Sequence, residues 1–306
     1  MAPIFASLQP LDKVSHYTPL GIRFWDLARD AAVVDGLQVT IRPPGRPDLQ
    51  RRAFQTRSGV FAFRNLPGLR NLEASDPDLA PGMHLVDASP LQTWRFVVDV
   101  EDRLGRFMAT TFQVDLPQRG IYPTQPVGSP PGLGLPGFFL FSAPTRSILA
   151  DMAVLRVHLV ERLPGGGARA AAYAVLEIAS SIAGGAPGST LAMGIADAQG
   201  GALVAFPYPS FAASIGYPSS PPSPPETRVQ AWDLFVQVRY SPATSQARPD
   251  SAARLPDLSA IVAQPPARIL PAAVGPGQFQ LNTRLVFGQP LTLRTAGSSS
   301  LWIEPQ

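Results

Sequence analysis

The stretch TRSGVFAFRNLP, residues 56 to 67, places a glycine before a run in which apolar residues alternate, and it ends on Leu-Pro. Glycine adopts the positive φ of a tight turn without a steric penalty. The alternation then directs Phe61 and Phe63 to one face, as in a β-strand with one buried side. Pro67 cannot donate to a strand ladder, so it marks the end of pairing. The stretch therefore predicts a turn and a strand, which is scaffold rather than a catalytic loop.

A looser copy of the pattern lies at residues 198 to 211, AQGGALVAFPYPSF. The strands that follow Trp94 and Trp232 match best, because apolar and polar residues alternate in step in both. We expect one face of each strand to be buried and the other to be wetted, as in an antiparallel sandwich. Any two β-sandwiches could share these features, but their order favours two units on a common plan. The corresponding residues are Ile41, Gly59, Phe61, Phe63 and Trp94 in the first half and Ile178, Gly200, Leu203, Ala205 and Trp232 in the second.

The composition agrees with many short strands joined by turns. The 306 residues include 35 prolines and 26 glycines, which suits strands and turns better than long helices. We predict an all-β protein of two antiparallel β-sandwich domains, with one short helix within LPDLSAIVAQ, residues 255 to 264. The predicted units are an extended arm at 1–20, a first sandwich at 21–117, a Pro/Gly-rich linker at 118–140, and a second sandwich at 141–306 with a Pro-rich loop at 216–226.

The N-terminal arm carries the apolar residues Ile4, Phe5 and Leu8 between prolines that disfavour a long helix. These side chains could dock on a partner protein or pack on their own domain. The arm lacks a basic n-region, so it is no ordinary signal peptide. No run approaches 18 apolar residues, so we expect no membrane span. The expected location is the cytoplasm of a bacterium, or an assembled particle released from it.

The charged residues exclude several partner classes. The formal net charge is only +3, and the densest basic stretch, RPDLQRR at 46–52, contains an acid. No basic stripe with interleaved aromatic residues is present, so nucleic acid is not an expected partner. The chain has no cysteine, which rules out disulfides and thiolate metal sites.

The sequence shows no set of residues with the spacing of a catalytic or metal site. The three histidines, His16, His84 and His158, are not spaced as metal ligands. Calcium could bind clustered carboxylates, but arginines flank the first of two candidate clusters, which favours a solvated strand edge. We therefore expect no metal, no cofactor and no enzymatic activity. The carboxylates considered are Asp99, Glu101 and Asp102 in one cluster and Asp76 and Asp78 in the other.

The opening stretch resembles the turn and strand of carboxypeptidase regulatory-like domains, which have a transthyretin-like fold. Thr56, Gly59, Phe61, Phe63, Leu66 and Pro67 stand at the positions of that family's T-x-x-G-x-F-x-F-x-x-L-P pattern. The resemblance covers residues 21 to 116 and, more weakly through Asp197, Gly200 and Leu203, residues 150 to 241. It implies two transthyretin-like or immunoglobulin-like sandwiches and carries no catalytic residues.

The whole chain also resembles accessory structural proteins of phage-tail-like contractile injection systems, through FRNLPGLR, FVVDVEDRLGRF, VDLPQRGIYP, FLFSAPTR and FPYP. That resemblance implies a non-enzymatic structural or adaptor subunit, with sheath, tube or baseplate proteins, or further copies of itself, as partners. Sandwich edges can accept an added strand, which makes such assembly physically available. The alternative is a carbohydrate- or surface-binding module that stacks sugars on exposed aromatic residues: Trp25, Tyr122, Tyr208 and Tyr217.

Overall fold

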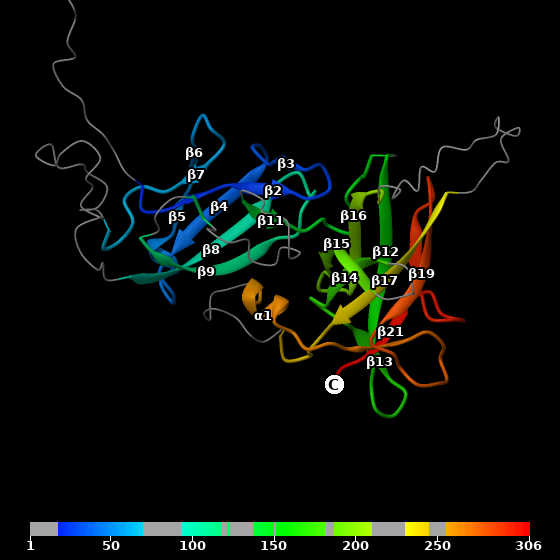
Figure 1. Cartoon of the computed structure of the whole chain (residues 1–306). Helices are drawn as coiled ribbons and strands as arrows, with labels where there is room; N and C mark the ends of the chain where they lie inside the picture. The colour runs from blue at the N-terminus through cyan, green and yellow to red at the C-terminus, as the bar shows by residue number, and fades with distance from the viewer. Residues whose placement is uncertain are drawn as a thin grey trace, which may run out of the picture.

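Two β-sandwiches follow each other along the chain and contact each other in the folded protein (Figure 1). The computed structural model describes residues 18–69, 93–117, 121–122, 137–149, 151–181, 187–209, 230–244 and 255–306. The expected all-β class is confirmed, because the helical elements in these ranges are one five-residue helix, α1 (Leu258–Val262), and a 3-10 turn, η1 (Pro47–Leu49). No helix within these ranges is long and apolar enough to cross a membrane. The predicted docking residues Ile4, Phe5 and Leu8, the loop at 216–226, and Asp76 and Asp78 lie outside the described residues.

The first sandwich packs one four-stranded sheet against a second four-stranded sheet and a three-stranded sheet. The order β5-β4-β8-β9 forms one layer, and β10-β1-β7-β6 together with β11-β2-β3 forms the other. The bounds are β1 (Gly21–Ile22), β2 (Phe24–Asp26), β3 (Ala31–Ala32), β4 (Leu37–Arg42), β5 (Arg51–Arg52), β6 (Phe54–Gln55), β7 (Phe61–Ala62), β8 (Trp94–Asp102), β9 (Thr110–Leu116), β10 (Ile121–Tyr122) and β11 (Phe138–Leu140).

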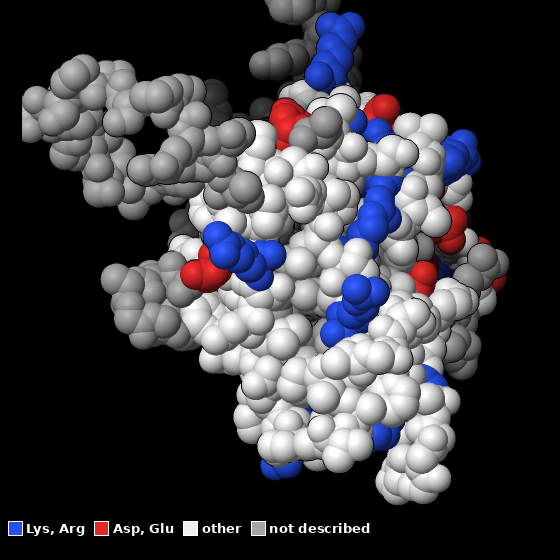
Figure 2. Space-filling model, turned by 90° about the vertical axis from the view of Figure 1, so that its right-hand side faces the viewer, with Lys and Arg blue, Asp and Glu red and all other residues white. Residues whose placement is uncertain are grey.

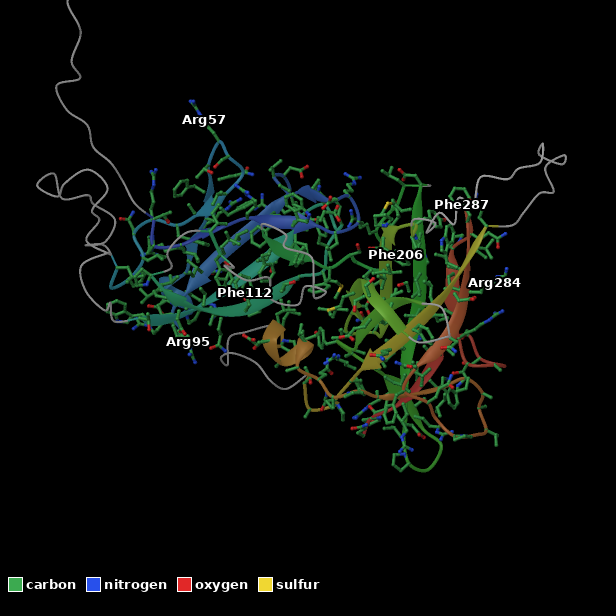
Figure 3. The ribbon with its side chains drawn as sticks, viewed as in Figure 1. Arg57, Arg95, Phe112, Phe206, Arg284 and Phe287 are labelled. Carbon is green, nitrogen blue, oxygen red and sulfur yellow. The ribbon has the colours of Figure 1, made fainter. Side chains whose placement is uncertain are left out.

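Phenylalanine rings fill the space between these layers. Phe24 meets Phe61 edge to face with 5.2 Å between ring centroids, and Phe112 stacks on Phe138 at 4.3 Å. Aromatic pairs of this kind stabilise a core by more than the area they bury. Phe112 lies within the first sandwich in Figure 3. The alternation read from the sequence therefore does place one row of side chains in a core.

The stretch predicted as a linker, 118–140, contributes strands to the first sandwich. Ile121–Tyr122 forms β10 beside β1, and Phe138–Leu140 forms β11 beside β2. Phe138 is buried in the first core. The first sandwich thus extends past residue 117, and that boundary was wrong. The prolines and glycines of residues 118–140 show where strand pairing stops. Short apolar segments between them can still pair when a neighbouring strand is available.

The second sandwich also has two layers. One layer is built around the long strand β12, which pairs with β13, β16, β20 and β21, and β18 extends it beyond β21. The other layer has the order β15-β14-β17-β19. The bounds are β12 (Met152–Arg162), β13 (Ala168–Ala170), β14 (Val175–Ser181), β15 (Pro187–Ile195), β16 (Gly201–Pro207), β17 (Ala231–Arg239), β18 (Arg268–Leu270), β19 (Leu281–Val286), β20 (Leu291–Leu293) and β21 (Leu301–Glu304).

The sandwiches are mainly but not purely antiparallel. The strand pairs β1–β10, β2–β11, β12–β20 and β12–β21 are parallel, and the other strand pairs are antiparallel. Each parallel partner joins its sheet only after a long intervening stretch of chain, as a parallel connection requires. The sequence pattern of a single strand carries no information about this direction.

The two sandwiches repeat one plan at the level of strand register. Ile41 of β4 faces Val98 of β8, and Ile178 of β14 faces Val236 of β17. The strands β8 and β17 also match residue by residue, because the second, fourth and sixth positions after each tryptophan are buried and the fifth is less so. The sheet β5-β4-β8-β9 in the first sandwich therefore corresponds to β15-β14-β17-β19 in the second.

An apolar seam joins the sandwiches. Val175 and Ile195 of the second sandwich are buried in the same cluster as the first core, together with Leu258 and Ile261 of α1. A second contact places Leu203 of β16 against Ala28. Because buried apolar contacts continue across the seam, the two sandwiches pack directly against each other and are not separate domains on a flexible linker.

Candidate functional site

The quoted turn is closed by a compact set of hydrogen bonds. The Gly59 N–H donates to the Thr56 carbonyl at 3.0 Å, and the Thr56 N–H donates to the Val60 carbonyl at 2.8 Å. The Thr56 hydroxyl accepts from the Val60 N–H at 3.1 Å. Gly59 has a φ of 76°, in the left-handed region that other residues enter at a cost. These contacts give both Thr56 and Gly59 a structural role in the turn.

The second sandwich builds the same turn with an aspartate in place of the threonine. The Gly200 N–H donates to the Asp197 carbonyl at 3.1 Å, and the Asp197 N–H donates to the Gly201 carbonyl at 2.7 Å. The Asp197 carboxylate accepts from the Gly201 N–H at 2.8 Å, where the Thr56 hydroxyl does so in the first copy. Gly200 has a φ of 86°. These three hydrogen bonds are therefore equivalent in the two turns.

This register corrects the alignment of the residues after the glycines. Two positions after Gly200 stands Ala202, which lies in the second core as Phe61 lies in the first. Leu203 and Ala205, which were matched to Phe61 and Phe63, point instead to the contact between the sandwiches. The mismatch arose because the two halves were matched by the order of their residues at unequal spacings, while the turn geometry sets which residue faces inward.

The remaining motif residues are structural as well. Phe63 and Leu66 are fully buried, and the backbone N–H and carbonyl of Phe63 both bond to the Thr18 hydroxyl. Pro67 stands in a turn after Leu66. Trp94 is 38% exposed at the start of β8, whereas Trp232 at the equivalent position stacks on Tyr208 with 5.3 Å between centroids. The structure thus distributes these residues between turns and cores and does not gather them into a cleft.

A polar pocket lies on the outer face of the β5-β4-β8-β9 sheet. The predicted wetted side of this sheet is only partly exposed, because η1 and the segment at Leu255 stand over it and leave a cavity of about 360 Å³. Thr40 is 8% exposed, Arg42 4% and Thr111 2%. Alternation alone could not reveal this burial, because it shows which face a side chain is on and not that η1 and the distant Leu255 cover that face.

Ion pairs and hydrogen bonds organise the floor of this pocket. The Arg42 guanidinium pairs with the Asp99 carboxylate at 3.3 Å, and the Thr111 hydroxyl donates to the same carboxylate at 2.7 Å. The Gln50 amide nitrogen donates to the Thr40 hydroxyl at 2.7 Å. Asp99 is opposite Thr40 on β4 and Thr111 on β9, so the strand register itself assembles the cluster.

Two carboxylates of the predicted calcium cluster, Asp99 and Glu101, line the pocket, and the third, Asp102, does not join them. Asp99 pairs with Arg42 on the pocket floor. Asp102, the last residue of β8, accepts hydrogen bonds from the Arg106 side chain and from the backbone N–H groups of Arg106 and Leu104. Burial pushes the pKa of Asp102 up, but these hydrogen bonds outweigh it and leave the pKa below its usual value. Among the described residues, no three histidine or carboxylate side chains come together as a metal site. His158 contacts the Ser300 hydroxyl at 2.9 Å.

The aromatic residues of the sugar-stacking alternative lie apart, in three different settings. Trp25 donates its indole N–H to Asp30 at 3.2 Å. Tyr122 stacks on Phe112, and burial, followed by the charges of Asp257 and Asp115, raises its pKa. Tyr208 packs against Trp232 and Phe287. These rings form no common platform, and Tyr217 lies outside the described residues.

The strand β19 lies at one edge of its sheet in the second sandwich. It is the last strand in its sheet order, and within the described residues it pairs only with β17. The Phe287 N–H donates to the Gln230 carbonyl at 2.9 Å, so hydrogen-bonded positions alternate from there along the strand. The backbone groups of Asn282, Arg284 and Val286 therefore point away from β17. Arg284 projects outward from this edge in Figure 3.

The surface around this edge carries few charges. Figure 2 shows basic side chains set among uncharged residues on the face at the β19 side, with acidic side chains also present. Phe287, directly after β19, is 53% exposed. Within the described residues, the outer edge of β19 thus has no strand partner, and a strand edge of this kind can accept an added strand.

No family model matches the sequence, and no curated protein matches it. Among solved structures, the Bacillus anthracis TIE protein is 7% identical with a TM-score of 0.23, over 95% of this chain and 34% of that one. GBS52, the minor pilin of Streptococcus agalactiae, is 8% identical with a TM-score of 0.24, over 94% and 96% of the two chains. A proposed adhesin from Bacteroides ovatus is 12% identical with a TM-score of 0.17, over 74% of each. TM-scores this low do not show a common fold.

Proposed function

We propose that this chain is a non-enzymatic structural or adaptor subunit that binds other proteins by strand addition at the free edge of β19. The observation that carries the proposal is a double sandwich joined by an apolar seam, with an edge strand, β19, that pairs only with β17 within the described residues. The backbone groups of Asn282 and Arg284 and the N–H of Val286 point outward from this edge, while the Val286 carbonyl accepts from the Gln289 N–H at 3.2 Å. Main-chain hydrogen bonds from an added strand provide affinity, and side chains along the edge provide selectivity.

The finer form of the proposal is a subunit of a phage-tail-like contractile injection particle, as the sequence resemblance implies. Its partners would be sheath, tube or baseplate proteins or further copies of the chain, and its place would be the bacterial cytoplasm or the released particle. Nucleic acid, membrane and cofactors have no part in this proposal. The Arg106–Asp102 ion pair has a structural role, because it orders the connection between β8 and β9.

An Arg284→Pro variant tests the strand-addition step. The Arg284 N–H points away from β17, so proline removes a group available to an added strand without breaking the existing ladder. Thr283→Ala changes the neighbouring residue and keeps its N–H, which makes it the matched control. We expect light scattering and co-purification from native cells to show wild-type assemblies that survive Thr283→Ala and are lost in Arg284→Pro.

Circular dichroism must show that Arg284→Pro keeps its strand content. A wild-type chain that is a lone monomer and brings down no particle subunit would contradict both forms of the proposal. Assemblies with proteins unrelated to any particle would contradict the finer form alone.

A further inference from the structure

The outer-face pocket of the first sandwich contains polar groups that make no hydrogen bond within the described residues. Arg42, Asp99 and Thr111 satisfy one another on its floor. On its walls, the amide nitrogen of Gln38, the amide oxygen of Gln50 and the carboxylate of Glu101 have no hydrogen-bond partner in the described part of the chain. The pocket thus presents a donor and several acceptors toward one small space.

The charges around this space are balanced. Arg42 pairs with Asp99, and Arg103 donates to the Gln38 amide oxygen at 2.6 Å beside Glu101. Among the residues that the structure describes, two cationic and two anionic side chains therefore lie in or beside the walls, and this balance favours neither a strongly anionic nor a strongly cationic ligand. A neutral ligand rich in both donors and acceptors fits this arrangement best.

The equivalent face of the second sandwich is built differently. Glu177 and Arg239 occupy the positions of Thr40 and Glu101 and pair with each other at 2.7 Å. Beyond them, Val175 and Ile195 use that layer to pack against the first sandwich. The same arrangement of strands therefore forms a packed contact on this face of the second sandwich and a pocket on this face of the first.

We propose that the pocket binds a single neutral sugar unit or a polyol of similar size. Each hydroxyl of such a ligand both donates and accepts, which matches the unpartnered Gln38, Gln50 and Glu101 groups. The volume of about 360 Å³ is at the small end of ligand pockets and suits one such unit. This inference does not depend on strand addition at β19, which lies in the other sandwich.

Saturation-transfer NMR on the full chain tests the inference. The probes are glucose, galactose, mannose and N-acetylglucosamine, with the acetylated amides of lysine and glutamine as cationic and non-sugar neutral probes. We expect saturable binding of at least one sugar. Gln38→Trp should fill the pocket mouth and weaken that binding by about tenfold or more, the effect of losing one well-placed partner.

Two further variants make the outcome decisive. Gln113→Trp places the same ring on the outer face of β9, outside the pocket lining, and should leave sugar binding unchanged. Glu101→Gln keeps an acceptor and should change the affinity by less than about threefold. If Gln38→Trp does not fold, Gln50→Met removes the wall amide instead and should also weaken binding.

Several results would overturn the inference. The first is that no sugar shows saturable binding, and the second is that sugar binding survives both Gln38→Trp and Gln50→Met. The third is that the lysine probe binds and that Glu101→Gln abolishes this binding. The fourth is that the glutamine probe binds more tightly than every sugar. The third would identify a basic side chain, and the fourth a peptide, as the occupant of the pocket.

Discussion

The equivalent turn glycines differ in what surrounds them, and this difference predicts unequal costs of substitution by alanine. A Cβ at Gly59 would come within 2.8 Å of a methyl group of Val34, a side chain that is half exposed. A Cβ at Gly200 would instead clash with the backbone carbonyl oxygen of Leu159. That carbonyl accepts from the Ala171 N–H at 3.0 Å, and the Leu159 N–H donates to the Gly200 carbonyl at 2.7 Å.

The magnitudes follow from two separate effects. A left-handed φ costs an alanine about 1 to 2 kcal/mol at either glycine. At Gly59 the Val34 side chain can turn away, so the total should stay near about 1 to 2 kcal/mol. At Gly200 the backbone must move and two buried hydrogen bonds weaken, which adds about 1 kcal/mol for each. The total for Gly200→Ala should therefore reach about 3 to 4 kcal/mol.

Each sandwich contains a control glycine. Gly105 in the first and Gly288 in the second have φ values of 66° and 73°, and a Cβ there would meet nothing within 4 Å. The free energy of unfolding can be measured by urea unfolding followed by tryptophan fluorescence. It should be similar for Gly59→Ala and Gly105→Ala, and it should be much lower for Gly200→Ala than for Gly288→Ala. Equal losses for Gly200→Ala and Gly288→Ala would refute the close packing of this turn on β12.

Two further predictions concern buried polar groups. Arg146 and Asp26 form a buried ion pair where the chain leaves the first sandwich. Arg146→Met should lower the free energy of unfolding in urea by about 3 to 5 kcal/mol, because it leaves the Asp26 charge buried without its partner, and adding Asp26→Asn to the same chain should recover part of this loss. If Asp26→Asn recovers nothing, lost packing and not the unpaired charge causes the loss. Burial, aided by its hydrogen bond to Glu161, raises the pKa of Tyr240 to about 12 from 10, so its contribution to stability is complete below pH 10 and is lost as pH rises toward 12. Tyr240→Phe should reduce that alkaline loss in pH-dependent unfolding, and an unchanged pH profile would show that the phenol does not carry it.

Much of the scaffold is predictable from the sequence because it depends on local patterns. Strong alternation identifies β8, β12 and β17, and the glycine turn is recognisable because Gly59 must have a positive φ. Short apolar segments were harder to assign. Phe138–Leu140 has no alternation and lies between prolines and glycines, and it becomes a strand only because β2 offers a parallel edge.

The pocket could not be predicted because its walls come from several distant segments. Alternation places Thr40 and Arg42 on the outer face, but their burial depends on η1 and Leu255. The inward direction of Ala202 rather than Leu203 likewise depends on the turn register and not on residue size. Local pattern thus predicts strands, while the identity of what covers a face is a property of the assembled fold.

Site-specific photocrosslinking in native cells tests the role of the β19 edge most directly. A photoreactive amino acid would replace Arg284 on this edge, and a control would carry the same residue in place of Gln113 on the first sandwich. The account predicts a covalent adduct with another protein subunit or a second copy at position 284 and none at position 113. No adduct at position 284, or the same adducts at both positions, would contradict it.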